Sequence, residues 1–187
     1  ENVTYLPRTT VQVLYDQGFS VATERRTDHL DSNIHTEMSR IRTWHIRAEH
    51  TVLATGAFQR HLVFANNDRP GIMLSHAAAT YVSNGANPFK SAVVVTVDNQ
   101  GYRDAVRLSQ AGVTVNAIVD IRNNPRGPSV EAAKAAGIQI ITGKTAIDTC
   151  EKEDGTVKCV SVGNPDGSDA ACIDGDLIAV SGGWTPV

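Results

Sequence analysis

The sequence predicts an α/β fold in which a three-stranded antiparallel meander precedes a parallel, Rossmann-type unit. In residues 9–48, three segments alternate apolar and polar side chains, as half-buried strands do. In residues 91–142, continuous apolar runs alternate with helical patterns that end at glycine, which is typical of βαβ units and a parallel sheet.

The composition excludes several classes of protein. Of the 187 residues, 41% are hydrophobic and 20% charged, an ordinary balance for a globular protein. The net charge of -3 favours neither a nucleic-acid nor an anionic-membrane partner, and no apolar run approaches the roughly 18 residues of a membrane span. We expect a cytoplasmic protein with no signal peptide. Because the chain starts at Glu1 without Met and ends directly after an apolar strand, we also expect a fragment of a longer polypeptide.

The first 50 residues form the predicted meander. Strands are expected over 9–16 and 19–27, joined by a turn at 16–18, and over 40–48, after a polar loop at 27–39. Alternation places the following residues on buried faces: Val11, Val13 and Tyr15 in the first strand, and Ile41, Trp44 (or Thr43) and Ile46 in the third. His45 is expected to face solvent.

A different kind of strand follows at residues 50–56. Val52, Leu53 and Ala54 are consecutive apolar residues, which indicates a strand covered on both faces. The strand stops at Thr55-Gly56-Ala57, and the turn-rich residues 66–71 predict a link into the next unit. Gly56 is either a turn glycine or a position where a phosphate or ribose approaches bare main chain.

The remaining elements continue the α/β pattern. We predict a helix over 71–84 that stops at Gly85, a βαβ unit with strands 92–97 and 113–119 around a helix at about 102–110, and a helix capped by Ser129 and stopped by Gly137. A strand over 138–142, hairpins over 145–172 and a buried strand over 177–183 complete the chain.

The βαβ unit lacks the glycines that hold a dinucleotide. After strand 92–97, a G-x-G-x-x-G motif would cradle the pyrophosphate, but only Gly101 is present. Asp98 would put a carboxylate where the pyrophosphate belongs, and Tyr102 would crowd the start of the helix. Asp120, at the end of the second strand, is then an acid whose carboxylate is either hydrogen-bonded within the protein (a satisfied acid) or solvated. The unit therefore resembles a Rossmann fold that has lost its nucleotide or never held one.

No side chains in the sequence suggest a catalytic or metal site. The six histidines are scattered, and Ser75-His76 has no third partner near it. Arg60 and Arg69 are interpreted as solvated cations. Three cysteines, Cys150, Cys159 and Cys172, are an odd number without metal-site spacing, and we interpret them as buried or incidental thiols in a reducing compartment.

Four segments together resemble the α subunit of heterotetrameric sarcosine oxidases. They are HIRAEHTVLATGAFQRHLVFANNDRPGIML (45–74), YRDAVRLSQAGVTVNAIVD (102–120), AAKAAGI (132–138) and AVSGGWTPV (179–187). The resemblance implies part of a glutathione-reductase-like FAD/NAD(P)-binding domain, at 1–72 with a return strand at 176–187, and an inserted Rossmann-like domain at 73–175. The family's Gly-rich motif and folate-binding domain lie outside this chain.

The resemblance also implies a cofactor, partners and site residues. The family's α subunit binds NAD, while FAD and FMN lie on or are shared with partners among the β, γ and δ subunits, and the complex demethylates sarcosine oxidatively to glycine. Val11 would offer its main chain to the adenine, and Thr55, Gly56 and Ala57 would line the wall beside the dinucleotide. Gly182 and Gly183 would mark a crossing between domains. Residues 58–61, Phe-Gln-Arg-His here, depart from the His-Glu-Arg-Pro that relatives more often carry.

Three other functions stay open. The chain could be a scaffold without a ligand site, or belong to a related amine dehydrogenase complex of the proline or opine type. A reductase with its own redox centre ranks last, because the sequence has no Cys-x-x-Cys. Without the upstream motif, we expect these 187 residues alone to bind nucleotide very weakly.

Overall fold

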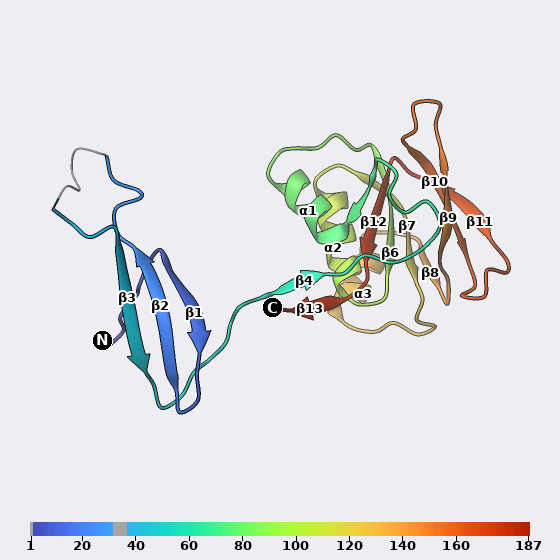
Figure 1. Ribbon diagram of the computed structural model, residues 1–187. Helices are drawn as coiled ribbons and strands as arrows, with labels where there is room; N and C mark the ends of the chain where they lie inside the picture. The colour runs from blue at the N-terminus through green and yellow to red at the C-terminus, as the bar shows by residue number, and fades with distance from the viewer. Residues whose placement is uncertain (1, 32–36) are drawn as a thin grey trace. The chain divides into compact units, whose positions relative to one another are not determined.

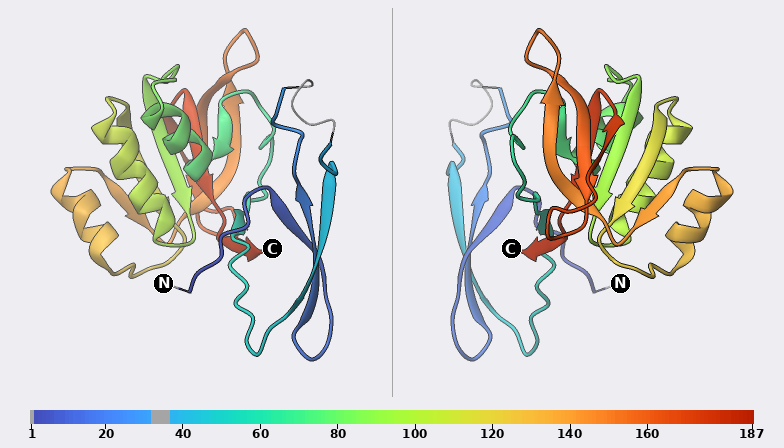
Figure 2. Two further views of the ribbon diagram at one scale, coloured as in Figure 1. Left: turned by 90° about the vertical axis from the view of Figure 1, so that its left-hand side faces the viewer. Right: turned by 90° about the vertical axis from the view of Figure 1, so that its right-hand side faces the viewer.

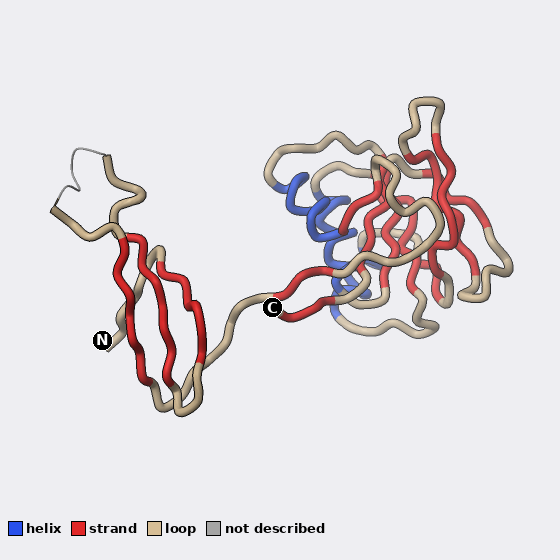
Figure 3. The backbone as a smooth tube through the Cα atoms, in the orientation of Figure 1, coloured by secondary structure: helices blue, strands red, loops and turns tan. Residues whose placement is uncertain are grey.

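The computed structural model describes residues 2–31 and 37–187 and is shown as a ribbon and as a tube (Figures 1 and 3). The chain forms two compact units, Glu1–Ala54 and Thr55–Val187. Residues 32–36 of the predicted loop lie outside the described residues. The domain limits inferred at 72/73 and 175/176 stay predictions.

The first unit contains the predicted meander. Its strands β1 (Thr9–Leu14), β2 (Phe19–Arg25) and β3 (Ile41–Arg47) pair antiparallel in that order. Among the described residues of this unit, Ala22 is the one fully buried hydrophobic side chain. A sheet of three short strands needs a covered face for stability, and here little side-chain area is buried.

Burial in the meander differs from the alternation at three positions. Val11, Tyr15 and Ile41 are 55%, 58% and 54% exposed, so the prediction that they are buried is wrong. The pairing of β1 with β2 shifts register between Val11 and Val13. In the first strand, such a shift interrupts the period of two on which the prediction of one continuous face depended. Trp44 and Ile46 are half-buried, and His45 is exposed as expected.

The second unit is built around a parallel sheet. Its five strands run in the order β5 (Ile72–Leu74), β12 (Leu177–Ser181), β6 (Ser91–Thr96), β7 (Thr114–Asp120) and β8 (Ile140–Thr142), and every neighbouring pair is parallel. A two-stranded ribbon of β4 (Ala57–Gln59) and β13 (Trp184–Pro186) adjoins it in sequence. The predicted parallel α/β unit is therefore confirmed.

Two layers cover the faces of the parallel sheet (Figure 2). On one side lie the helices α1 (Ser75–Ser83), α2 (Gln100–Gln110) and α3 (Pro128–Ala135). On the other lies the antiparallel sheet of β9 (Thr145–Glu151), β10 (Val157–Gly163) and β11 (Ala171–Asp174), which forms the predicted hairpins. In β6, Ala92 and Val94 pack towards the helices, while Val93 and Val95 pack towards the antiparallel sheet. Burial on both faces explains the continuous apolar runs.

Two element boundaries differ from the sequence-based expectation. The helix predicted over 71–84 begins only at Ser75, because Ile72, Met73 and Leu74 pair as β5 with Ile178–Val180 of β12. Three consecutive apolar residues fit a short strand and a helix equally well in sequence. Ser129 lies inside α3 and makes no cap, because Gly127 is the N-cap and Pro128 the first helical residue.

Candidate functional site

The carboxyl ends of the parallel strands are where an open α/β sheet binds its ligands. Here Asp98 occupies that place after β6. Its carboxylate accepts hydrogen bonds from Ser181 Oγ at the end of β12, at 2.9 Å, and from the main-chain N–H of Gln100 at 3.0 Å. Gln100 is the first residue of α2, so a side-chain carboxylate takes the helix N-terminus that a pyrophosphate would use.

A second group of polar side chains continues this hydrogen-bonded layer. Gln59 Nε2 donates to Ser75 Oγ at 3.0 Å and to Ser181 Oγ at 2.9 Å, and so ties β4 to the sheet edge. Ser75 Oγ in turn donates to the fully buried Asp104, at 2.7 Å. His76 Nδ1 lies 3.5 Å from the same carboxylate. The Ser75 proton therefore points to Asp104 and not to His76, so this trio does not form a nucleophile and its base.

Gly101 has a packing role. A Cβ at this position would lie 2.5 Å from both Cβ and Oγ1 of Thr96 in β6. The glycine lets α2 approach β6 closely, which is one of the roles glycine has in a dinucleotide fold. The glycines that would cradle a phosphate are absent from this sequence.

Asp120, at the end of β7, is held by protein donors on all sides. It is 0% exposed and accepts from Tyr102 Oη at 2.9 Å, from Arg122 Nη2 at 2.7 Å and from the Arg122 main-chain N–H at 2.9 Å. Burial first, and then the bond to Asp120, raise the pKa of Tyr102, which keeps its proton and stays a donor. Arg122 also donates to Asn99 at 2.9 Å. Of the two sequence-based alternatives, the satisfied acid is the one observed.

These contacts leave the second unit without a dinucleotide cradle at its sheet edge. Asp98 fills the phosphate position, and Asp120 has no free oxygen directed at a ribose. Within the described residues, no three His, Cys, Asp or Glu side chains gather as a metal site requires. In the same part of the chain, no helix combines the length and the apolar character needed to cross a bilayer.

The strand end at Thr55-Gly56-Ala57 offers bare main chain. Thr55 Oγ1 donates to the Val187 carbonyl at 2.5 Å, and the Val187 N–H donates to Gly56 O at 3.2 Å. Gly56 has φ +85°, and no atom lies within 4 Å of the place where a Cβ would be. The backbone conformation alone already favours glycine here, and the space beside it is open.

The four residues inferred to contact NAD are divided between the two units. Thr55, Gly56 and Ala57 belong to the second unit, whereas Val11 lies in β1 of the first unit. Because β1 is an edge strand, the main-chain groups on one of its sides are paired with no described strand. The site role of all four residues stays a prediction.

Residues 52–54 do not form the strand that the sequence predicts. Val52 and Leu53 are 88% and 66% exposed, and no described strand pairs with this segment. A strand can be buried on both faces only where neighbouring strands satisfy its main-chain groups. The described chain provides no such neighbour, so the prediction is wrong for the structure observed.

Of the two arginines interpreted as solvated cations, Arg60 is exposed as expected, whereas the guanidinium of Arg69 has protein partners. Arg60 exchanges main-chain hydrogen bonds with Gly182 and Gly183, both at 2.8 Å, where the segments around β4 and β13 run together. Arg69 donates to the Thr149 carbonyl at 2.7 Å and pairs with Glu151 at 3.2 Å. Sequence reasoning missed these roles because each partner lies far along the chain.

The cysteine interpretation also needs correction. Cys150 in β9 and Cys159 in β10 are opposite in register and joined by a disulfide, with Cα atoms 5.2 Å apart. Cys172 is a free, exposed thiol. The hairpins predicted over 145–172 were the signal that could have indicated the pairing, because adjacent hairpin strands bring Cys150 and Cys159 opposite one another.

Comparison with known proteins confirms the resemblance stated from the sequence. No protein-family model matches the chain. Over 193 aligned residues the chain is 40% identical to the sarcosine oxidase subunit alpha of Corynebacterium sp. (strain P-1), covering 100% of this chain and 20% of that protein. The subunit alpha from Corynebacterium sp. (strain U-96) is 37% identical with the same coverage. The chain thus spans about a fifth of the length of these curated relatives.

Solved structures confirm the fold. The thioredoxin reductase of T. acidophilum matches 95% of this chain and 53% of its own, with a TM-score of 0.60 and 17% identity. A FAD-dependent pyridine nucleotide-disulphide oxidoreductase from Desulfovibrio vulgaris matches 96% of this chain and 44% of its own, with a TM-score of 0.56 and 18% identity. The chain therefore has the fold of an FAD/NAD(P)-binding oxidoreductase.

Proposed function

We propose, from the similarity to sarcosine oxidase subunit alpha along the whole chain, that this protein is part of the NAD-binding α subunit of a multi-subunit sarcosine oxidase. In that role it supports the oxidative demethylation of sarcosine to glycine in the cytoplasm. FAD and FMN are then held on or shared with partner subunits among β, γ and δ. The similarity over every segment of the chain is the observation that carries this proposal.

NAD is assigned to the strand end of Thr55, Gly56 and Ala57 and to the main chain of Val11. Support comes from the open space beside Gly56 and from the edge position of β1. Bare main chain lets a dinucleotide approach closely, because no Cβ intervenes. When bound, NAD supplies a hydride acceptor, and these residues bind and orient it.

The second unit supports a different role. Its sheet edge is filled by Asp98, Gln59 and Ser181, and Asp120 is satisfied by Tyr102 and Arg122. We therefore assign no nucleotide to this unit and give it a scaffold role within the subunit. A scaffold role for the entire chain is the alternative function that this observation favours.

The test is the nucleotide retained by the full-length subunit purified with its partners. The released nucleotide is identified by chromatography after denaturation, for wild type, Gly56→Val, Gly56→Asn and the control Gly167→Val. Gly167 has the same φ of +85° and the same open surroundings but lies in the turn between β10 and β11. Asn tolerates positive φ, whereas Val does not, so Gly56→Asn tests space and Gly56→Val tests space and conformation together.

We expect NAD in wild type and in Gly167→Val, and none in either Gly56 variant. Wild type without nucleotide would favour the scaffold, and retention by Gly56→Asn would show that Gly56 serves conformation only. Oxidation of sarcosine in preference to proline or opines by the assembled complex distinguishes the oxidase from a related amine dehydrogenase. For the isolated 187 residues, micromolar binding of NAD by titration calorimetry would contradict the expected very weak binding.

A further inference from the structure

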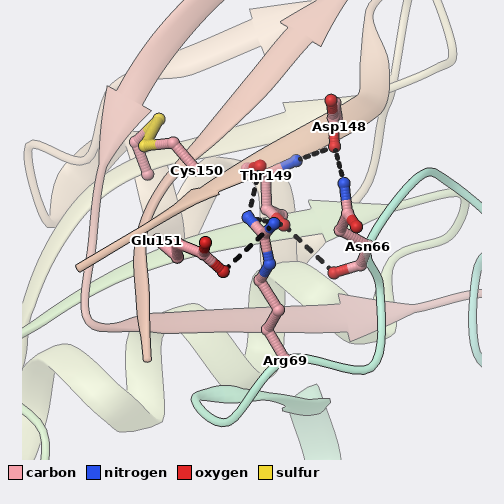
Figure 4. The surroundings of a disulfide bond; sticks show 7 residues. Asn66, Arg69, Asp148, Thr149, Cys150 and Glu151 are labelled. Carbon is pink, nitrogen blue, oxygen red and sulfur yellow. Dashed lines mark hydrogen bonds and ion pairs between the residues drawn. A yellow bond between two sulfur atoms is a disulfide. The ribbon is translucent and has the colours of Figure 1, made fainter. Parts of the chain in front are cut away.

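We propose that Cys150 and Cys159 form a reversible thiol–disulfide couple whose state controls how firmly the segment 65–71 is held against β9. This segment leads into β5, so it connects the β4–β13 ribbon to the parallel sheet. Figure 4 shows the disulfide beside the side chains that hold the segment.

The hairpin can keep its two sulfur atoms together in either state. Residues on both sides of the disulfide pair across β9 and β10, with Val157 opposite Glu151 and Val160 opposite Thr149. Main-chain pairing therefore persists when the S–S bond is broken, and the thiols remain close enough to re-form it. Cys150 is half-buried and Cys159 is 2% exposed, so Cys150 is the sulfur that an incoming thiol or oxidant reaches first.

The residues beside Cys150 make the contacts that hold the segment 65–71 against β9. Arg69 donates to the Thr149 carbonyl at 2.7 Å and pairs with the Glu151 carboxylate at 3.2 Å. One step earlier in β9, Asp148 accepts from Asn66 Nδ2 at 2.7 Å, and Thr149 Oγ1 donates to Asn66 O at 3.0 Å. Residues 148, 149 and 151 thus surround the cysteine and supply all these contacts.

The other strand of the hairpin is coupled to the segment too. The Val157 N–H donates to Pro70 O at 2.9 Å, two residues before Cys159. The pairing of β9 with β10 shifts register between Val157 and Cys159, and such an irregularity makes strand spacing and twist adaptable there. Breaking the S–S bond releases the constraint on spacing between these strands. The acceptors of Arg69 in β9 then move relative to the Val157 N–H in β10. The hydrogen bonds and the ion pair that hold the segment 65–71 weaken as a result.

The chemistry balances with a hydroperoxide as oxidant and a dithiol as reductant. The Cys150 thiolate attacks hydrogen peroxide, forms a sulfenic acid and releases hydroxide; Cys159 thiolate then attacks the Cys150 sulfur and displaces a second hydroxide. Two thiols and one peroxide give one disulfide and two waters, a transfer of two electrons. A dithiol reverses the step by exchange and leaves as its own disulfide.

The first experiment maps the couple in the 187-residue chain. Free thiols are alkylated after treatment with hydrogen peroxide or dithiothreitol, and the chain is digested with trypsin without reduction. Lys152 and Lys158 lie between the two cysteines, so a disulfide holds two separate tryptic peptides together. We expect this linked pair after peroxide and its loss after dithiothreitol, with Cys172 alkylated throughout. Absence of the pair after peroxide, or a bond that dithiothreitol leaves intact in the folded chain, overturns the proposal.

The second experiment measures how firmly the segment 65–71 is held, from the rate of amide hydrogen exchange in peptides that span residues 62–71. The Ala65 N–H, which donates to Ile147 O at 3.0 Å, is a reporter. We expect exchange in the reduced chain to be at least about fivefold faster than in the oxidised chain, the lower end of ordinary coupling between sites.

Three variants separate coupling from general loosening. Cys150→Ser combined with Cys159→Ser should exchange at the reduced rate and ignore the redox state, while Cys172→Ser should behave as wild type. In Arg69→Met, the segment should exchange fast in both redox states. This variant removes the guanidinium contacts to β9 but leaves Cys150 and Cys159 able to form and break their disulfide. Equal exchange of residues 62–71 in oxidised and reduced wild type, with the disulfide shown to be made and broken, would overturn the coupling.

Discussion

Arg122→Met tests how much the ion pair between Arg122 and Asp120 stabilises the edge of the parallel sheet. Methionine keeps the apolar stem and the main-chain N–H that donates to Asp120, but removes the guanidinium contacts at 2.7 and 3.0 Å. Asp120 is 0% exposed, so its carboxylate gains no water in exchange. The variant therefore leaves a buried charge with fewer donors.

The magnitude follows from what remains. Removing one partner of a buried ion pair costs about 3–5 kcal/mol. Asp120 keeps the Tyr102 hydroxyl at 2.9 Å, and Arg122 is itself 35% exposed, so solvent already weakens part of the pair. We therefore expect the low end, about 3 kcal/mol. With a urea m-value of about 2 kcal/mol/M, the midpoint falls by about 1.5 M.

Urea unfolding followed by circular dichroism at 222 nm is the assay, because every described helix lies in the second unit. Arg126→Met is the matched control, since Arg126 is exposed. Its free energy of unfolding should change by less than about 0.5 kcal/mol. Adding Asp120→Asn to Arg122→Met should recover part of the loss by removing the stranded charge. A midpoint for Arg122→Met equal to that of the control would refute the reasoning.

Three further outcomes are expected. Gly101→Ala should destabilise the second unit by about 1–3 kcal/mol despite the better helix propensity of alanine, and unchanged urea stability would contradict its packing role. Under oxidising conditions, Cys150→Ser with Cys159→Ser should lose about 2.6 kcal/mol, the loop entropy for a sequence separation of 9; equal unfolding midpoints in the presence and absence of reductant in wild type would disprove this. The hydrogen bond from Asn66 holds the pKa of Asp148 below its usual 3.8, so its stabilisation is present above that pH and is lost as pH falls further. Asn66→Ala should raise this pKa in an NMR titration, and an unmoved pKa would speak against the bond.

The sequence was sufficient for the order and type of most elements. Alternation with a period of two predicts β1, β2 and β3, and continuous apolar runs predict β6, β7 and β12. The missing glycines after β6 predict the lack of a phosphate cradle, because each glycine in that motif has a steric task that other residues do not perform. These are local properties that neighbours in sequence decide.

Sequence reasoning failed where the deciding partner is distant. Residues 72–74 form a strand because β12, about a hundred residues later, pairs with them. The exposure of Val52 and Leu53 depends on strands that would have to flank them. The disulfide between Cys150 and Cys159 required the hairpin register, which composition does not encode.

By itself, the sequence determined which segments avoid water and with which period, and therefore most of the elements and the absence of a cradle. Only the tertiary structure decided what fills the sheet edge. Gln59 reaches Ser181 across a sequence separation of 122 residues, and Ser181 reaches Asp98 across 83. Periodicity records how each side chain is shared between water and the core, whereas hydrogen bonds between distant strands depend on topology, which brings their donors and acceptors within 3 Å of one another only after the chain has folded.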